Sequence, residues 1–147
     1  MTVFRSASAV FLTTLFFLLP LACKQPSSTV TVTEVIDGDT IVIQGGIHVR
    51  YIGIDSPEVN EFYYAESRQW NADMVAGKQV RLEGDVTDKD KYGRLLRYAF
   101  VGDTFVNAEM VRQGCAWAEA YPPDLKYQVY LKAMEKEARE LQRGFWK

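Results

Sequence analysis

The sequence is poor in the residues that build most metal centres and disulfide frameworks. Its 147 residues include two cysteines, Cys23 and Cys115, and one histidine, His48. Two cysteines do not make a disulfide framework, and a zinc site needs more ligands at defined spacing. A metal site built from several histidines is excluded as well. Acid–base chemistry that depends on histidine would rest on His48 alone.

The sequence also lacks an excess of positive charge. Its formal net charge is −2 at pH 7, and the only charged residue in its apolar leader is Arg5. A protein with this balance has no general attraction for polyanions. Any binding of nucleic acid must therefore come from a local basic patch or from a bound cation.

A long apolar run occurs only at the N-terminus. Residues 1–23 indicate an export signal, in which Arg5 supplies the positive end and residues 10–19 form an apolar run too short for a comfortable membrane span. The run ends in L-L-P-L-A-C, and a small residue before a cysteine resembles a lipoprotein signal in which Cys23 is lipid-modified. The proline and leucine before Ala22 depart from that pattern. Ordinary cleavage nearby, which would give a secreted protein, is the alternative.

The rest of the chain is expected to form one exported domain. Residues 24–28, K-Q-P-S-S, are polar and predict a short tether, and the folded domain is expected over residues 29–147. A lipid on Cys23 would hold this domain at a membrane surface without spanning the membrane. No internal repeat is present, and nothing in the sequence indicates more than a monomer.

Apolar periodicity predicts an α+β fold. Alternating residues predict strands at 29–36, 41–43, 47–54, 78–83 and 95–101. Helices are predicted at 61–75, 107–114 (with Asn107 as N-cap) and 125–143. Their inward faces are expected at Phe62, Ala65, Gln69, Ala72 and Ala76 and at Leu125, Tyr130, Met134, Ala138 and Leu141. A five-stranded Greek-key barrel with helices packed against it fits this order best, although fold alone does not supply a function.

Three charged stretches stand where strands are predicted to end. They are Asp37–Thr40 (D-G-D-T), Arg50 followed by Asp55–Glu58 (D-S-P-E), and residues 88–94 (D-K-D-K-Y-G-R). Each alone is compatible with a simple turn or a solvated loop. The first three strands are neighbours, however, so Asp39 and Asp55 are expected to meet at one end of the barrel.

The residue types in these stretches suit metal-assisted phosphodiester hydrolysis. Two neighbouring carboxylates repel each other unless they share a proton or a cation, and oxygen ligands favour Ca²⁺ or Mg²⁺. Arg50 and Arg94 are suited to grip a phosphate and to stabilise the charge of its transition state. Glu58 is placed to position or deprotonate a water molecule.

Five motifs carry a resemblance to a known family. They are V-I-D-G-D-T at 35–40, R-Y-I-G-I-D-S-P-E at 50–58, D-K-Y-G-R at 90–94, V-N-A-E-M-V-R-Q-G at 106–114 and G-F-W at 144–146. In this order and spacing, from about residue 30 to residue 146, the chain resembles the staphylococcal nuclease (thermonuclease) family. The resemblance implies an OB-fold with three helices. It also implies an endonuclease that cuts single-stranded DNA and RNA and leaves 3′-phosphate ends.

The resemblance also implies a calcium site. Asp39 and Asp55 would ligate Ca²⁺ through their carboxylates, and Ser56 would do so through its backbone carbonyl. The family often has threonine in place of Ser56, but a carbonyl ligand does not depend on that side chain. Asp37 matches an acid that shapes the turn near the metal.

Further roles follow from the same resemblance. Arg50 and Arg94 would bind the phosphate and stabilise the transition state, and Glu58 would activate or orient water. Lys91 and Tyr92 resemble residues that meet the phosphate and nucleotide of the substrate.

Two departures from the family concern substrate binding. The family member that gives the group its name has a longer loop after the P-E pair than residues 59–64 here. The tyrosines of its nucleotide pocket do not align cleanly, and Tyr121, displaced by about one residue, is the nearest candidate. Trp117 or Tyr121 is expected to serve as a base-stacking platform.

Other conspicuous residues are assigned structural roles. His48 is expected to be a partly exposed strand residue, and Cys115 a small buried one. The aromatic group at residues 62–64 and Trp70 is expected to pack the first helix rather than to bind bases. Two other functions stay open, namely a non-catalytic OB-fold module that binds nucleic acid or another partner, and a phosphodiesterase of small nucleotides.

Overall fold

The computed structural model describes residues 29–147 of the chain. The predicted signal over residues 1–23, with its lipidation site Cys23, and the predicted tether over residues 24–28 lie outside the described residues. Among the residues that are described, no helix has the length and apolar character needed to cross a membrane.

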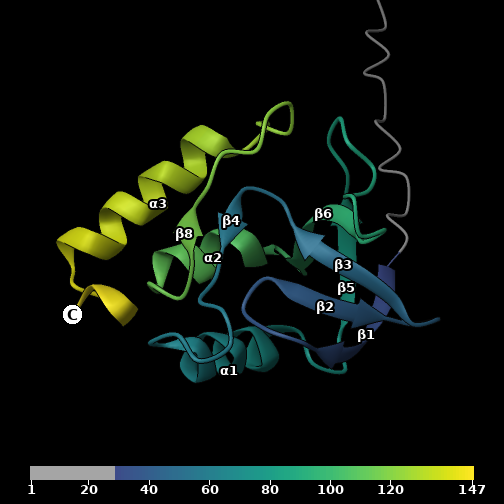
Figure 1. Cartoon of the computed structure of the whole chain (residues 1–147), viewed down its shortest axis with the longest axis horizontal. Coiled ribbons are helices and arrows are strands. Elements are labelled where there is room, and N and C mark those ends of the chain that lie inside the picture. The colour runs from purple at the N-terminus through teal and green to yellow at the C-terminus, as the bar shows by residue number, and fades with distance from the viewer. Residues whose placement is uncertain (1–28) are drawn as a thin grey trace, which may run out of the picture.

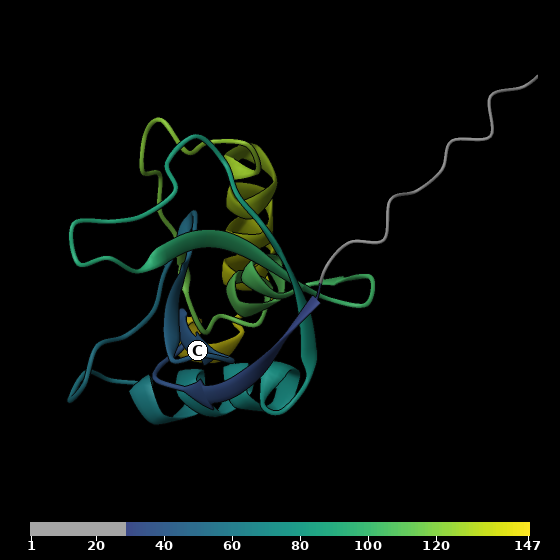
Figure 2. The ribbon, with the colours of Figure 1, turned by 90° about the vertical axis from the view of Figure 1, so that its right-hand side faces the viewer.

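Five strands close into a barrel, as the sequence predicts. They are β1 (Thr29–Val35), β2 (Thr40–Ile43), β3 (Ile47–Tyr51), β5 (Gln79–Glu83) and β6 (Leu95–Val101). The strands follow the order β3-β2-β1-β5-β6, and a parallel pairing of β3 with β6 closes the barrel (Figures 1 and 2). The short strand β7 (Thr104–Phe105) extends this sheet beyond β6. The closed five-stranded barrel with three helices confirms the predicted OB-fold.

Apolar side chains fill the interior of the barrel. Val32, Ile41, Val49, Val80 and Ala99 come from the five strands, and each is at most 1% exposed. Most of them are β-branched, which favours extended backbone and packs well on a pleated surface. The apolar side chains that point into the barrel therefore fix the register of the strands.

The third predicted strand is two strands. The prediction of one strand over residues 47–54 is wrong, because the chain turns at Ile52 and Gly53 between β3 and β4 (Ile54–Asp55). Gly53 has a φ of 78°, in the left-handed region that glycine adopts without steric cost. After this turn, β4 leaves the barrel and pairs with β8 (Trp117–Ala118) in a separate two-stranded sheet. The turn carries Asp55 and Ser56 towards the end of β1.

Three helices pack around the barrel. They are α1 (Tyr64–Val75), α2 (Val106–Arg112) and α3 (Gln128–Glu140), and a 3₁₀ turn over Gly144–Trp146 ends the chain. Figures 1 and 2 show α1 lying across one end of the barrel and α2 and α3 packed at the side of the barrel. The first helix begins three residues later than predicted, because Asn60 and Tyr63 have φ values of 73° and 71°. Residues 59–63 therefore form a loop.

The predicted inward face of α1 is largely wrong, because only Ala72 of its five residues packs against the core. This helix buries Ser67, Asn71 and Val75, whereas Phe62, just before it, is 78% exposed. The Ser67 hydroxyl donates a hydrogen bond to the Cys115 carbonyl at 2.7 Å. The Asn71 amide donates to the Asp37 carbonyl at 2.8 Å. These polar side chains are buried because they satisfy backbone groups of other segments, which apolar periodicity cannot reveal.

The predicted inward face of α3 is also largely wrong. The helix buries Leu131, Glu135 and Ala138, whereas three residues expected inside are 43–57% exposed: Leu125, Tyr130 and Leu141. The helix is shorter than predicted at both ends, and Leu125 and Leu141 fall outside it.

Asn107 has a different role from the predicted helix cap. It lies inside α2, with Phe105 at the N-cap position. Its buried side chain accepts a hydrogen bond from the Ala99 amide and donates one to the Ile52 carbonyl, both at 2.9 Å. Asn107 thus ties α2 to β6 and to the turn that separates β3 from β4.

Candidate active site

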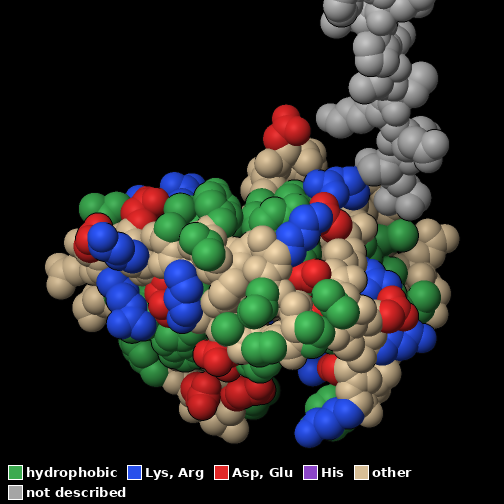
Figure 3. All heavy atoms as spheres, turned by 90° about the horizontal axis from the view of Figure 1, so that it is seen from above, with side chains coloured by type: hydrophobic (Ala, Val, Ile, Leu, Met, Phe, Trp, Pro, Cys, Tyr) green, Lys and Arg blue, Asp and Glu red, His purple; other side chains and the backbone are tan. Residues whose placement is uncertain are grey.

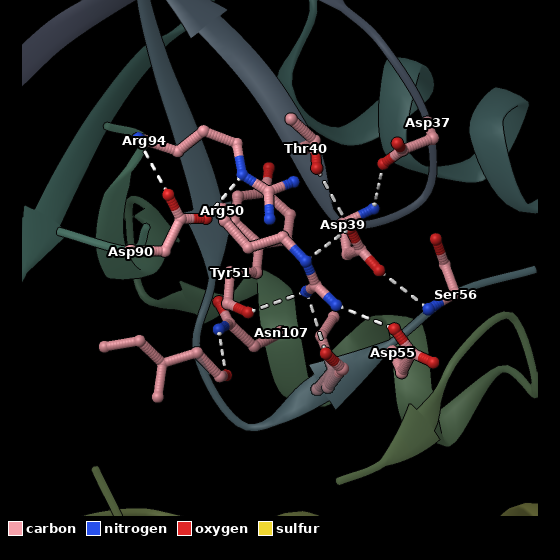
Figure 4. Close-up of polar contacts among 12 residues, drawn as sticks. Asp37, Asp39, Thr40, Arg50, Tyr51, Asp55, Ser56, Asp90, Arg94 and Asn107 are labelled. Carbon is pink, nitrogen blue, oxygen red and sulfur yellow. Dashed lines mark hydrogen bonds and ion pairs between the residues drawn. The ribbon is translucent and has the colours of Figure 1, made fainter. Parts of the chain in front are cut away.

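Arg50 is the centre of a polar cluster at one end of the barrel. Its backbone lies in β3 and pairs with Thr40 in β2, and its side chain is only 13% exposed. Its Nη1 donates to the carbonyls of Tyr51 and Ile54 at 3.0 and 2.8 Å. Its Nη2 contacts Asp55 Oδ1 at 2.7 Å (Figure 4). The guanidinium is therefore fixed by the same turn that carries Asp55.

Asp39 holds the other side of this guanidinium. Its Oδ1 lies 3.1 Å from Arg50 Nε and accepts a hydrogen bond from the Thr40 hydroxyl at 3.0 Å. Its Oδ2 accepts the Ser56 amide at 2.7 Å. The expectation that Asp39 and Asp55 meet at one end of the barrel is confirmed, because both contact the same guanidinium (Figure 4).

The turn that presents Asp39 depends on a glycine. The Asp37 carboxylate accepts the Asp39 amide at 2.9 Å, which closes the D-G-D-T turn. A Cβ atom on Gly38 would lie 2.0 Å from Ser67 Oγ and 2.7 Å from Ser56 Cβ. Gly38 is needed because α1 and the residues after β4 approach the turn too closely for any side chain.

Burial shapes the titration of both carboxylates. Desolvation raises the pKa of Asp39 to about 6, against the opposing attraction of Arg50 and with support from the negative charge of Asp37. Desolvation also raises the pKa of Asp55, again opposed by Arg50, while the charge of Asp39 adds to the increase. One guanidinium therefore does not fully offset the cost of keeping these acids charged.

Arg94 approaches the cluster from the loop between β5 and β6. Its Nε contacts Asp90 Oδ2 at 2.6 Å, and Asp90 Oδ1 accepts the amides of Tyr92 and Arg94 at 2.9 and 3.0 Å. The hydrogen bonds from Arg94 lower the pKa of Asp90. Figure 4 shows the Arg94 side chain extending towards Arg50. Among residues 29–147, neither terminal nitrogen of Arg94 has a hydrogen-bond partner, so both are available to an anion.

A hollow of about 320 Å³ lies between the two arginines. Its wall combines β3, the loop before β6 and the segment after β8, and it includes Arg50, Tyr51, Thr87, Asp90, Arg94, Tyr121, Pro122 and Asp124. Tyr121 is 46% exposed there. The hollow therefore has two cationic groups and the exposed ring of Tyr121 on its wall, which suits a phosphate joined to a nucleoside.

Two side chains missed by the sequence reasoning help to shape this hollow. Asp90 orients Arg94, and the spacing of four residues between an acid and an arginine was an available signal. Asp124 is 4% exposed and accepts the Thr87 amide at 2.7 Å, which joins the two loops of the hollow. That pairing spans 37 residues of sequence, so no local pattern indicates it.

Four further predicted site residues, Glu58, Lys91, Tyr92 and Trp117, do not line this hollow. Glu58 is exposed on the loop after β4, where its amide donates to the Glu61 carboxylate at 2.8 Å. Tyr92 is 72% exposed, with Lys91 Nζ 5.0 Å from the centre of its ring. Trp117, expected as an alternative stacking platform, instead stacks on Phe145 with 4.4 Å between ring centres.

The predictions for two remaining residues are confirmed. His48 is exposed on β3, and Cys115 is fully buried. Burial raises the pKa of the Cys115 thiol to about 12, which makes it unreactive.

The donor atoms at the cluster suit a hard cation. Within residues 29–147, no group of three or more His, Cys, Asp or Glu side chains is arranged to hold a metal ion. The cluster nevertheless brings together two carboxylates, Asp39 and Asp55, whose pKa values are raised by desolvation that the attraction of Arg50 does not fully offset. A divalent cation bound by these two carboxylates, a backbone carbonyl and water would relieve that cost.

The surface around the site has mixed charge. Figure 3 shows Lys and Arg side chains next to Asp and Glu side chains over the face that carries the loop tips. Attraction of a polyanion must therefore be local, as the net charge of −2 predicts.

Comparison with known proteins identifies the family. The family described as Staphylococcal nuclease homologue matches residues 48–147. A thermonuclease of Staphylococcus intermedius is 37% identical over 124 residues, which cover 78% of this chain and 74% of the relative. A thermonuclease of Staphylococcus hyicus is 34% identical over 127 residues, or 80% and 75% of the two chains. An uncharacterized endonuclease of Haemophilus influenzae is 34% identical over 137 residues, or 90% and 74%.

Proposed function

Because this chain belongs to the staphylococcal nuclease family, we propose that it is a calcium-dependent endonuclease that cuts single-stranded DNA and RNA and leaves 3′-phosphate ends. Nuclease activity follows from the family and from the endonucleases among its relatives. The calcium dependence, the two substrates and the product ends are the proposed part. The observation that carries the proposal is the convergence of Arg50 and Arg94 on one hollow beside Asp39 and Asp55.

Asp39, Asp55 and the carbonyl of Ser56 are the proposed ligands of Ca²⁺. Calcium prefers carboxylate and carbonyl oxygens and leaves room for water and a substrate oxygen. When bound, it would polarise the scissile phosphate and favour its attack by water. The inward carboxylate of Asp39 is pre-oriented for this role, because Thr40 and Ser56 fix both of its oxygens.

The two arginines have complementary roles in this proposal. Arg50 makes three hydrogen bonds through Nη1 and Nη2 and an ion pair with Asp39 through Nε, which leaves one N–H group of Nη2 for the phosphate. Arg94 is held only through Nε, which leaves two terminal nitrogens for a bidentate grip. Arg50 would therefore act as a rigid hydrogen-bond donor. Arg94 would keep its hydrogen bonds to the phosphate as the phosphorus becomes five-coordinate in the transition state.

Glu58 is the proposed group that orients or deprotonates the attacking water. Its carboxylate forms no hydrogen bond with any residue in the range 29–147, so it is free to accept one from water. Asp55, the last residue of β4, lies only three residues earlier in the sequence. The water oxygen would bond to phosphorus as its proton passes to Glu58, the bond from phosphorus to the 5′ oxygen would break, and the leaving 5′ oxygen would take up a proton from solvent.

We also propose that the nuclease domain is exported and acts as a monomer, either held at a membrane through Cys23 on its periplasmic or cell-surface face, or secreted. The apolar leader and the L-A-C sequence at residues 21–23 support this location. Metabolic labelling with a radioactive fatty acid would test it, with Cys23→Ser as the control. Label that persists on Cys23→Ser would contradict lipidation at this residue.

The activity itself is tested with heat-denatured DNA and with RNA. The full-length chain is incubated with each substrate in millimolar Ca²⁺ and in an excess of a calcium chelator, and the product ends are identified. We expect cutting only with calcium, and products that a 3′-phosphatase can dephosphorylate. Binding without cutting in the presence of calcium would contradict the enzyme and favour a non-catalytic binding module.

A further inference from the structure

A second hollow, of about 600 Å³, lies beside the first on the other side of Arg94. We call it the side groove. It lies between the turn joining β2 to β3 and the loop before β6, and Ile47, His48, Lys89, Tyr92 and Arg94 line it. No role in the proposed chemistry involves Ile47, His48 or Lys89.

The side groove is continuous with the candidate active site. Arg94 lines both hollows. His48 and Arg50 are two residues apart on β3, so both side chains leave the same face of the strand, about 6.6 Å apart. Lys89 is held next to them, because its backbone bridges Leu95, which pairs with Val49. A strand of nucleic acid that leaves the first hollow past Arg94 would therefore enter the side groove.

The charge of the side groove differs from that of the whole protein. No Asp or Glu lines it, although the net charge of the chain is −2. The two acids that flank Lys89 in the sequence are already paired, Asp88 with Arg97 and Asp90 with Arg94. Lys89 has no ion-pair partner within the described range 29–147. Lys89 thus offers an uncompensated positive charge to an anion.

The side groove also offers surfaces for a base. Tyr92 is 72% exposed and Ile47 is 45% exposed, so both side chains present apolar surface to solvent. Lys91 Nζ and Arg94 Cζ lie 5.0 and 5.5 Å from the centre of the Tyr92 ring. An exposed ring flanked by cations is the arrangement on which single-stranded nucleic acid stacks its bases.

We propose that the side groove binds one further nucleotide of a single-stranded substrate, next to the nucleotide held between Arg50 and Arg94. Lys89 and His48 contact its phosphate, and its base lies against Tyr92 and Ile47. This inference rests on the proposed nuclease function and names a subsite for the same substrate. It explains how a protein of negative net charge attracts a polyanion locally.

The first test compares short and long substrates. The full-length chain is assayed with calcium on a dinucleotide and on a single-stranded hexanucleotide, as wild type and as a His48→Ala, Lys89→Ala double variant. We expect KM for the hexanucleotide to rise roughly tenfold in the variant, while kcat and the dinucleotide kinetics stay unchanged. Lys136→Ala is the matched control, because it removes an exposed lysine from α3, which does not line the side groove. An equal change for both substrates, or none, would overturn the subsite.

The second test measures binding without cutting. A labelled hexanucleotide is titrated with the wild type, with Lys89→Ala and with Lys136→Ala in a calcium chelator, over a range of salt concentrations. We expect Lys89→Ala to weaken binding and to reduce the salt slope of log K by about 0.7, the loss of one phosphate contact on a single strand. A slope equal to that of Lys136→Ala would overturn the proposal. This readout also separates the two proposals, because it does not depend on whether the chain cuts its substrate.

Discussion

Arg50 Nε lies 3.1 Å from Asp39 Oδ1, although the two residues belong to different strand ends and are 11 positions apart in the sequence. Both side chains are largely buried, with exposed fractions of 13% for Arg50 and 6% for Asp39. A buried charge needs a partner, and breaking such a pair leaves the other charge uncompensated. The pair therefore fixes the position of a phosphate donor and of a metal ligand at the same time.

Replacing Arg94 should reduce the chemical step. Because both of its terminal nitrogens are free to grip the phosphate, Arg94→Ala should lower kcat by about 10²–10³-fold. Arg94→Lys should recover little of this loss, since an ammonium cannot bind two phosphate oxygens in the same fork geometry. Steady-state kinetics on a single-stranded oligonucleotide would measure both effects, with Arg139→Ala on α3 as the control. A kcat for Arg94→Ala near that of the wild type would show that Arg94 has no part in the transition state.

The metal-free protein should lose stability as the pH rises through the range from about 4 to 6. The pKa of Asp39 is raised in the folded protein to about 6, from 3.8 without burial, so the folded state binds this proton more tightly than the unfolded state. The tighter binding of this proton therefore adds its full contribution to the free energy of unfolding below pH 3.8, and that contribution is lost as the pH rises through 6. The expected loss is on the order of 2–3 kcal/mol.

Urea unfolding in a calcium chelator between pH 3.5 and pH 7, about the limits of that titration, would measure this effect. The comparison is with Asp39→Asn, which cannot titrate at this position and should show a flatter pH dependence over the same range. The difference between the two curves matters, rather than either absolute stability, because the substitution also removes a partner of Arg50. Parallel curves would contradict a raised pKa at Asp39.

Gly53→Ala should destabilise the turn that separates β3 from β4. The residue has a φ of 78°, and a Cβ atom would lie 2.6 Å from Leu131 Cδ1. Gly46→Ala is the matched control, because Gly46 has a φ of 74° but nothing lies within 4 Å of its Cβ position. We expect a cost of about 1–2 kcal/mol for the control and about 1–3 kcal/mol more for Gly53→Ala. Equal free energies of unfolding for Gly53→Ala and Gly46→Ala would show that α3 shifts to make room for the added methyl group.

The parts of the fold that depend on local pattern could be predicted from the sequence. Strand β6, for example, has the predicted bounds of residues 95–101, because apolar alternation and flanking turn residues define it. The meeting of Asp39 with Asp55 could also be predicted, since consecutive antiparallel strands bring their ends together.

The errors arise where a tertiary contact overrides the pattern. The break at Gly53 depends on β4 pairing with β8, which is some 60 residues away in the sequence. Phe62 was expected to pack against the first helix, but the left-handed backbone of Asn60 and Tyr63 leaves it on an exposed loop. Asn71 and Asn107 were not expected in the core, because their burial depends on distant backbone groups that they satisfy.

The rate of a single turnover with Glu58→Gln tests the central claim most directly. A labelled single-stranded oligonucleotide is bound by excess full-length protein in saturating calcium, so that the rate reports cleavage and not substrate binding or product release. Glutamine keeps the size of the side chain but cannot accept a proton. The account predicts a rate reduced by about 10²-fold or more, with unchanged binding of the oligonucleotide. A rate equal to that of the wild type would contradict activation of water by Glu58 at this site.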